Sequence, residues 1–395
     1  MQNVYKKKGD PMITDSSRGI LLADHSGKAL AGMVKEKIDP EYVVKMPSTQ
    51  FGAVPKRGAD QASHIVRSAA DAAAMWNFSI VVLFLDLVKA FDRVIRELVF
   101  GWGPHPPVDK TGFLKARGVS DRASAWIIDY LNEHGNLLAQ WKVDEGAAEL
   151  AESLHAGAWF GVADIPQVVR TTTGGRQGCK LGALTFNSVY SIALDILTAG
   201  LQKEGITLRL RVPASPFWSQ IAPTFEPEDT HVLDAAFVDD ESLIIVAQSG
   251  RALDKAIDIM LTHVFTGFEN AHLEINTAPG KTEALLKYRG KHSSSLRERR
   301  RDTDGKLYLQ VPGRQQRIGV VECYEHLGTF ANLTGEGNRN ALHRCKSAMA
   351  AYIPLAKKLL DHPWSSCGTR SCSWRHWCFH DYFLHYTSQF RAQQK

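Results

Sequence analysis

Three carboxylates stand at the ends of apolar runs. Asp86 directly follows the six apolar residues 80–85, and Asp239 and Asp240 lie between two further apolar runs. An acidic residue at the end of a buried strand is costly unless it is paired or bound to a metal ion. If the strands are neighbours in one sheet, the three side chains converge, and hard oxygen ligands of this kind suit Mg²⁺. Two such ions can activate an attacking oxygen and stabilise a leaving one during phosphoryl transfer.

Each carboxylate also has a purely structural interpretation. Aspartate is favoured in turns, so Asp239 and Asp240 are compatible with simple turn chemistry. Asp86 is compatible with an N-cap for a helical turn over 89–92. The conjunction of the three carboxylates favours a metal site over separate structural roles.

The periodicity of the chain predicts the elements that must position these side chains. Residues 80–85 are typical of a fully buried strand, and residues 235–247 predict a strand, a tight acidic turn and a second strand. Further predicted elements are helices over 27–34, 59–76 (capped by Asp60), 121–138, 147–159, 184–200 and 252–269, a short strand near 168–172 and a proline-rich loop over 213–230. This mixture of helices and strands is typical of an α+β fold.

The composition is that of a globular protein, with 395 residues, 44% hydrophobic and 23% charged. These values exclude a wholly disordered chain, a collagen and a coiled coil. No apolar run approaches ~18 residues, so we expect no membrane span, and the N-terminal segment lacks the apolar region of a secretory signal. The six scattered cysteines favour a reducing, intracellular compartment. No obligate protein partner is evident.

The net charge of +5 is concentrated in one segment. Residues 281–317 contain eleven Lys and Arg against four Asp and Glu, so the remaining chain is close to neutral. Such a stretch could contact nucleic-acid phosphates. The alternatives are a nuclear-import patch, which would make the protein nuclear, and a flexible charged loop.

The C-terminal tail is crowded with Cys, His and Trp. Its potential ligands are Cys367, Cys372, His376, Cys378 and His380. Their spacing matches no pattern dominated by Cys-x2-Cys, so we do not expect zinc. The tail is better interpreted as the degraded or out-of-frame end of a longer element.

Seven segments together resemble one known family. Phe84–Asp92, Gly174–Phe186, Phe237–Asp240, Leu273–Glu283 and Tyr324–Gly328 are similar, in this order, to the five palm motifs of the reverse transcriptase domain of non-LTR (LINE-type) retrotransposons, and Arg18–Leu22 and Gln50–Gly58 are similar to two finger motifs. The similarity covers roughly residues 5–360. No single segment is specific, but seven in the family's order are.

The resemblance implies a right-hand polymerase fold, with fingers and a palm whose antiparallel sheet packs on helices. Fingers would occupy residues 1–79, and the palm residues 80–330 with insertions at about 101–170 and 205–232 and the basic segment 281–317. Residues 331–395 would form a partial thumb or degenerate tail, so the thumb is incomplete. The implied activity is that of an RNA-directed DNA polymerase, which joins dNTPs to the 3′-hydroxyl of a DNA primer on an RNA template.

The resemblance also implies a metal site. Asp86 and Asp239 would bridge two Mg²⁺ ions, with Mn²⁺ as the alternative, and Asp240 would be more peripheral. Lys281 matches a lysine of the fourth motif that could protonate the leaving pyrophosphate. Its alternative interpretation is a solvated turn lysine.

Four further residues would contact substrate. Phe91 would crowd the sugar 2′ position and exclude ribonucleotides, or it is a core aromatic residue. Gln177 and Gly178 would lie close to the incoming nucleotide, since glycine permits a tight backbone. Arg18 would contact the triphosphate through a forked hydrogen bond, or it forms a surface salt bridge.

Two alternatives to an active polymerase remain. The first is a catalytically dead, nucleic-acid-binding remnant that keeps the palm but lacks a working thumb; the second motif departs from the family's pattern at Lys180, Gly182 and Ala183, which favours it. The second is a group II intron maturase. The forms of the first and fifth motifs are closer to LINE-type enzymes.

Overall fold

The computed structural model describes residues 2–5, 10, 12, 17–20, 24–161, 168–206, 209–211, 229–231, 234–334 and 338–355. The chain divides into two compact units, Met1–Gly335 and Glu336–Lys395. Within the second unit the structure describes one helix, α12 (Asn338–Leu355). The predicted elements and cysteines of the tail beyond residue 355 lie outside the described residues. All the sheets that the structure describes and the candidate site belong to the first unit.

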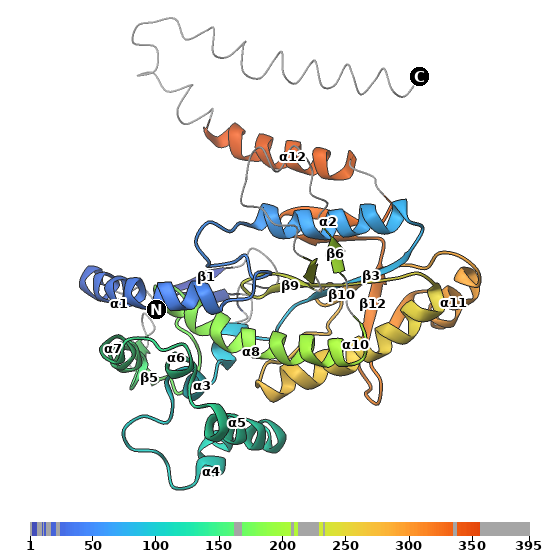
Figure 1. The fold of residues 1–395 in the computed structure, drawn as a ribbon. Coiled ribbons are helices and arrows are strands. Elements are labelled where there is room, and N and C mark those ends of the chain that lie inside the picture. The colour runs from blue at the N-terminus through green and yellow to red at the C-terminus, as the bar shows by residue number, and fades with distance from the viewer. Residues whose placement is uncertain are drawn as a thin grey trace, which may run out of the picture. The chain divides into compact units, whose positions relative to one another are not determined.

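A six-stranded sheet forms the centre of this unit (Figure 1). Its strand order is β11 (Leu307–Gln310), β12 (Arg317–Val321), β10 (Glu283–Lys287), β3 (Ser79–Leu85), β9 (Asp240–Ala247) and β8 (Asp234–Phe237). Neighbouring strands are antiparallel except β10 and β12, which are parallel. The sheet and its helices confirm a mixed α+β protein with a mostly antiparallel sheet.

Strand β3 is buried along its whole length because helices cover both faces of the sheet. Helix α2 (Ala59–Met75) packs on one face, and α10 (Gly250–Asn270) packs on the other together with α8 (Gly182–Lys203) (Figure 1). The side chains of β3 alternate between two hydrophobic clusters, one on each face. This explains why residues 80–85 form an unbroken apolar run rather than an alternating one.

The predicted helices are confirmed in place, and several differ in length. Helix α1 (His25–Lys45) is longer than the predicted 27–34, because the buried Ile38 and Tyr42 continue its apolar face past Pro40. Helix α2 is capped by Gly58 and not by Asp60, since Gln61 Oε1 accepts a hydrogen bond from the N–H of Gly58 at 2.9 Å. The prediction of Asp60 as the cap was therefore wrong.

The segment between β3 and α8 is mostly helical. Its elements are η2 (Ala90–Arg93), α3 (Arg96–Phe100), α4 (Lys110–Lys115), α5 (Asp121–His134), α6 (Leu137–Gln140), α7 (Glu145–His155), β4 (Trp159–Gly161) and β5 (Val168–Arg170). Helix α5 ends earlier than predicted because Gly135 takes a left-handed φ of +73°. The short helix α6 follows in place of the predicted continuation, and α7 corresponds to the predicted helix over 147–159.

The remaining elements are paired strands and one helix. They are β1 (Gln2–Tyr5) with β2 (Ser17–Ile20), β6 (Arg209–Arg211) with β7 (Asp229–His231), β13 (Cys323–His326) with β14 (Thr329–Asn332), and α11 (Ser293–Arg299). Most of the predicted loop over 213–230 lies outside the described residues.

Helix α8 is the one described helix that is long and apolar enough to cross a membrane. However, 72% of its apolar window is buried inside the protein, as expected for a core helix.

The basic segment 281–317 is not a flexible loop. It forms β10, α11, β11 and β12, and its arginines are largely paired with carboxylates. Arg299 and Arg300 contact Asp254 at 2.9 and 2.8 Å, and Arg314 contacts Glu269 at 2.6 Å. Much of the charge that marks this segment in the sequence is therefore compensated by acidic residues of α10.

Candidate functional site

The register of two inner strands of the sheet brings Asp86 and Asp240 to neighbouring positions at the strand ends. The register of β3 and β9 pairs Leu85 with Glu241, so the next residue of β3, Asp86, is opposite Asp240. Adjacent antiparallel strands are separated by about 5 Å. The convergence expected from the sequence is thus produced by the pairing of two strands that are about 150 residues apart in the chain.

Asp239 lies in the two-residue turn of the β8–β9 hairpin. Phe237 pairs with Asp240, which leaves Val238 and Asp239 as the turn. Val238 has a φ of +60° and Asp239 does not have a positive φ, which is the pattern of a type II′ turn. Glycine is the usual residue at this first turn position, and a β-branched side chain there costs roughly 1–3 kcal/mol. The strained residue directly precedes the Asp pair.

The loop before β10 holds both oxygens of the Asp86 side chain. Asn276 Nδ2 donates to Asp86 Oδ2 at 2.8 Å, and Lys281 Nζ lies 3.4 Å from Asp86 Oδ1. The backbone of Asp86 is held as well: its N–H donates to Thr282 Oγ1 at 3.1 Å, and its carbonyl accepts from the N–H of Asn276 at 2.8 Å. The structure thus places Lys281 beside the first carboxylate, with 45% of its side chain exposed.

Tyr324 marks the face on which the carboxylates stand. Its ring stacks on Phe84 with centroids 4.4 Å apart, and its hydroxyl donates to the carbonyl of Lys281 at 3.0 Å. Burial and the negative charges of Asp86 and Asp240 raise the pKa of Tyr324 to about 12. Residues opposite each other on adjacent strands share a face of the sheet, so the register of β3 and β9 assigns Asp86 and Asp240 to the same face.

The loop that contains Gln177 and Gly178 is packed against the turn that carries Phe91. The N–H of Gly175 donates to the carbonyl of Phe91 at 2.7 Å. The Phe91 ring stacks on Phe186 of α8, with centroids 4.8 Å apart, so its interpretation as a core aromatic residue has direct structural support.

The structure shows no contact between the carboxylates and the other predicted substrate residues within its described part. Gln177 is partly buried, and Gly178 is exposed with a φ of +95°, a conformation that glycine adopts readily. No described contact joins either residue to the carboxylates. Arg18 pairs with Val4 in the β1–β2 hairpin, but its side chain lies outside the described residues. Asp86 does not cap the η2 turn, because Lys89 occupies the N-cap position.

The β8–β9 hairpin itself contains two buried carboxyl groups, Glu241 and Asp234, and the buried Tyr190 of α8 contacts the first of them. Glu241 is fully buried, and its Oε2 accepts a hydrogen bond from the hydroxyl of Tyr190 at 3.2 Å. Burial raises the pKa of Glu241 well above its usual range. Burial also raises the pKa of Asp234 to about 6, although Thr49 Oγ1 donates to its Oδ2 at 2.9 Å. The hairpin therefore contains two carboxyl groups whose pKa is raised by burial.

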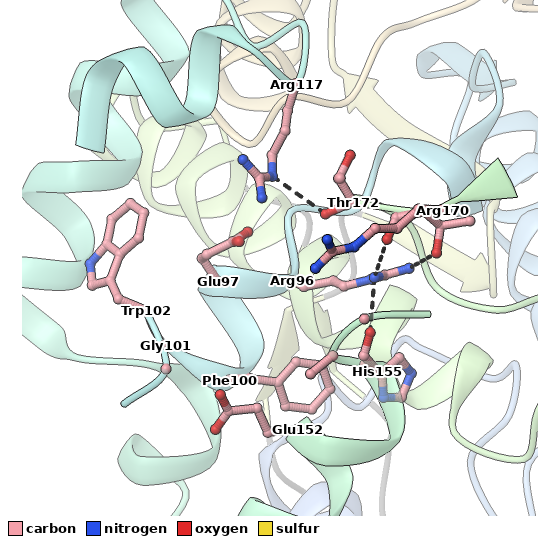
Figure 2. A pocket seen from close by; sticks show the side chains of 14 residues that line it. Arg96, Glu97, Phe100, Gly101, Trp102, Arg117, Glu152, His155, Arg170 and Thr172 are labelled. Carbon is pink, nitrogen blue, oxygen red and sulfur yellow. Dashed lines mark hydrogen bonds between the residues drawn. The ribbon is translucent and has the colours of Figure 1, made fainter. Parts of the chain in front are cut away.

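Arg96 holds in place the loop that contains Gln177 and Gly178, called the second-motif loop below. Its guanidinium is buried and donates to the carbonyls of Gly174, His155, Thr171 and Thr173, and to Thr171 Oγ1, at 2.8–3.1 Å. Figure 2 shows this arrangement at the wall of a cavity of about 150 Å³. Sequence reasoning missed Arg96, because a single arginine after a helical turn carries no signal of its four carbonyl partners.

Two more arginines line the same cavity (Figure 2). Arg117 lies with its guanidinium 3.3 Å from the centroid of the Phe113 ring and donates to the carbonyl of Thr172. Arg170 is exposed at the end of β5. Neither forms an ion pair with any residue in the described part of the chain.

The carboxylates can be tested as magnesium ligands by their chemistry. Asp86, Asp239 and Asp240 supply the hard oxygen donors that Mg²⁺ requires. In the described part of the chain, no three Asp, Glu, His or Cys side chains are gathered closely enough to hold a metal. The oxygen donors are of the type that Mg²⁺ prefers, and in this structure Lys281 supplies the positive charge next to Asp86. Metal binding would require these side chains to turn toward one another.

No protein-family model matches the chain, and no curated protein matches it.

Proposed function

We propose that this chain is an RNA-directed DNA polymerase of a retroelement, of the non-LTR type, with fingers, a palm and an incomplete thumb. One observation carries the proposal: Asp86 lies opposite Asp240 on adjoining strands, directly beside the strained turn that holds Asp239. The order of the seven motif-like segments in the sequence supports the same assignment.

The residues around the carboxylates have defined tasks in this proposal. Asp86, Asp239 and Asp240 would hold two Mg²⁺ ions, or Mn²⁺, whose charge would assist attack of the primer 3′-hydroxyl on a dNTP and departure of pyrophosphate. Asn276 orients the Asp86 carboxylate through its hydrogen bond at 2.8 Å. Lys281 is the proton donor of the proposal, since its ammonium group is already at the site.

The nucleotide would lie between the carboxylates and the second-motif loop. That loop contains Gln177 and Gly178 and is fixed by Arg96. Phe91, packed beneath the loop, would limit the room at the sugar 2′ position. Arg18 would contact the triphosphate.

The cavity of Figure 2 supports an anionic partner. Arg96, Arg117 and Arg170 line it together with two carboxylates, Glu97 and Glu152. Neither Arg117 nor Arg170 forms an ion pair with a described residue, whereas the arginines of the basic segment are largely paired. Guanidinium groups outside an ion pair are available to phosphates. We therefore assign the contact with the RNA template to this cavity rather than to the segment 281–317.

Primer extension on an RNA template tests the proposal. We expect incorporation of dNTPs that requires a divalent cation and that falls to background in Asp239→Ala. The matched control is Asp129→Ala, which removes an aspartate on α5, away from the carboxylates. Equal activity in the parent and in Asp239→Ala would contradict the mechanism.

One observation favours a second candidate, a nucleic-acid-binding remnant without catalysis. Both oxygens of Asp86 are occupied by Asn276 and Lys281 rather than directed toward the Asp pair. A parent protein that binds RNA and extends no primer under any divalent cation would establish this candidate instead.

A further inference from the structure

We propose that Gln50 is the positioning residue of the Asp-bearing turn: its side-chain amide holds the strained backbone of Val238 and so sets the direction of Asp239 and Asp240. The inference deepens the proposed function and rests on it for its consequence, because the turn matters only if its carboxylates bind a metal. The structural part of the inference stands on the contacts alone.

The Gln50 side chain binds both polar backbone groups of Val238. Gln50 Oε1 accepts from the N–H of Val238 at 3.0 Å, and Gln50 Nε2 donates to the carbonyl of Val238 at 3.3 Å. The same Oε1 accepts from the N–H of Gly52 at 2.9 Å. With 2% of its surface exposed, Gln50 makes these bonds away from water.

The amide is the required chemistry at this position. One side chain must accept from an N–H and donate to a carbonyl of the same residue, and only an amide presents both functions side by side. A Val238 with a φ of +60° is unfavourable on its own, so the turn needs external restraint to keep this conformation. Gln50 supplies it from a segment 188 residues away in the chain.

The backbone around Gln50 is itself fixed against the hairpin. Gln50 forms an isolated parallel bridge with Ala236, in which the N–H of Phe51 donates to the Ala236 carbonyl at 2.7 Å. A Cβ on Gly52 would lie 2.2 Å from the Val238 nitrogen, so the two backbones meet at a distance that only glycine allows.

Two further contacts anchor the segment to the rest of the unit. Arg57 Nη1 donates to the carbonyl of Gln50 at 2.8 Å, and Asn187 Nδ2 of α8 donates to the carbonyl of Gly52 at 2.9 Å. The backbone on both sides of Phe51 is thus held in place by side chains from other segments. Residues 50–57, which are expected to belong to the fingers, are therefore hydrogen-bonded to the turn at Val238, which is expected to form part of the catalytic centre.

Gln50→Met tests the inference, because methionine keeps the length and bulk of the side chain and removes all three hydrogen bonds. The readout is hydrogen–deuterium exchange of the peptide 234–242 in the metal-free protein. We expect the Val238 amide to exchange about tenfold faster, with exchange across α8 unchanged. Gln61→Met is the matched control, since Gln61 accepts from a backbone N–H at the start of α2 and not at the turn.

The second readout is the affinity for Mn²⁺, followed by electron paramagnetic resonance. We expect Gln50→Met to bind Mn²⁺ about tenfold more weakly than the parent, as is usual when an outer partner of a ligand is removed. Gln61→Met is expected to bind as the parent does.

The two readouts separate the inference from the proposed function. Unchanged exchange at the turn in Gln50→Met, or an equal increase in Gln61→Met, would overturn the inference whatever the activity. Faster exchange with unchanged Mn²⁺ affinity would overturn the link between the turn and the metal. A parent that binds Mn²⁺ and responds to Gln50→Met as expected, but extends no primer, would support the inference and contradict the proposed function.

Discussion

Phe91 packs in the core, and in the proposed function it also selects dNTPs over rNTPs. Its ring stacks on Phe186, and its backbone carbonyl accepts from Gly175 in the second-motif loop. If the ring also limits the space at the sugar, its removal should admit ribonucleotides. We expect Phe91→Val to raise the ratio of rNTP to dNTP incorporation about 10- to 100-fold, the range typical of a small steric difference in a pocket.

Single-nucleotide extension with each substrate class measures this ratio. Phe186→Leu is the control, because it disturbs the same stacked pair from α8. A ratio that rises equally in both variants would show that Phe91 acts only through packing.

Asp234 is the residue that should dominate the pH dependence of stability near the site. Burial raises its pKa to about 6, so the folded state keeps a proton that the unfolded state releases above pH ~4. The stability from this group is present below that pH and is lost as the pH rises to about 6. Asp234→Asn keeps an acceptor for Thr49 and cannot ionise.

We therefore expect the free energy of unfolding of Asp234→Asn, relative to that of the parent, to increase by on the order of 3 kcal/mol as the pH rises from ~3.5 to ~7. Urea unfolding at a series of pH values measures the difference. A constant difference between parent and variant over this range would show that Asp234 does not titrate as the structure predicts.

Individual residues of the site were predictable from the sequence only where they follow an apolar run or lie in a motif-like segment. Asp86 and Asp239 follow apolar runs, and Lys281 lies in a motif-like segment. The partners that orient them were not predictable, because Asn276 and Gln50 reach the site through pairings of 190 and 188 residues. Nothing in the local spacing of an Asn or a Gln encodes such a contact.

At the scale of elements, Arg96 connects the second-motif loop to the cavity beside it, because it binds the loop and lines the cavity. Arg96 fixes the loop, while Arg117 and Arg170 line the cavity beside Glu97 and Glu152 and form no ion pair with a described residue. We expect the double variant Arg117→Ala, Arg170→Ala to bind single-stranded RNA more weakly. The slope of log affinity against log salt should become shallower by about 0.7 for each phosphate that the variant no longer neutralises.

Fluorescence anisotropy at several salt concentrations measures this slope. Arg299→Ala is the matched control, since Arg299 is exposed but paired with Asp254. An unchanged slope in the double variant, or an equal change in Arg299→Ala, would remove the cavity from the nucleic-acid interface.

Elements were predicted well where their apolar pattern is strong. The strands β3, β8 and β9 and the helices α2, α8 and α10 lie where the periodicity placed them. The errors occur where packing overrides a local signal: α1 runs through Pro40, and Gly58 rather than Asp60 begins α2. The sheet order itself was not predictable, since it depends on long-range pairing.

At the scale of the whole molecule, the net charge of a segment did not indicate how many of its basic side chains are free of ion pairs. The segment 281–317 holds the excess of basic residues, yet its arginines pair with Asp254, Glu269 and Asp302. The first unit, Met1–Gly335, contains the sheet, the carboxylates and the arginine-lined cavity. Metal binding and RNA binding are therefore both proposed for this one unit.

The central claim is that Asp86, Asp239 and Asp240 act as one divalent-cation site. The most direct test is a Mn²⁺ titration followed by electron paramagnetic resonance, comparing the parent with Asp86→Asn, Asp239→Asn and the control Asp129→Asn. We predict that the parent and Asp129→Asn bind Mn²⁺ with equal affinity and that each of the other two variants loses at least one ion. Equal Mn²⁺ binding by all four proteins would contradict this claim.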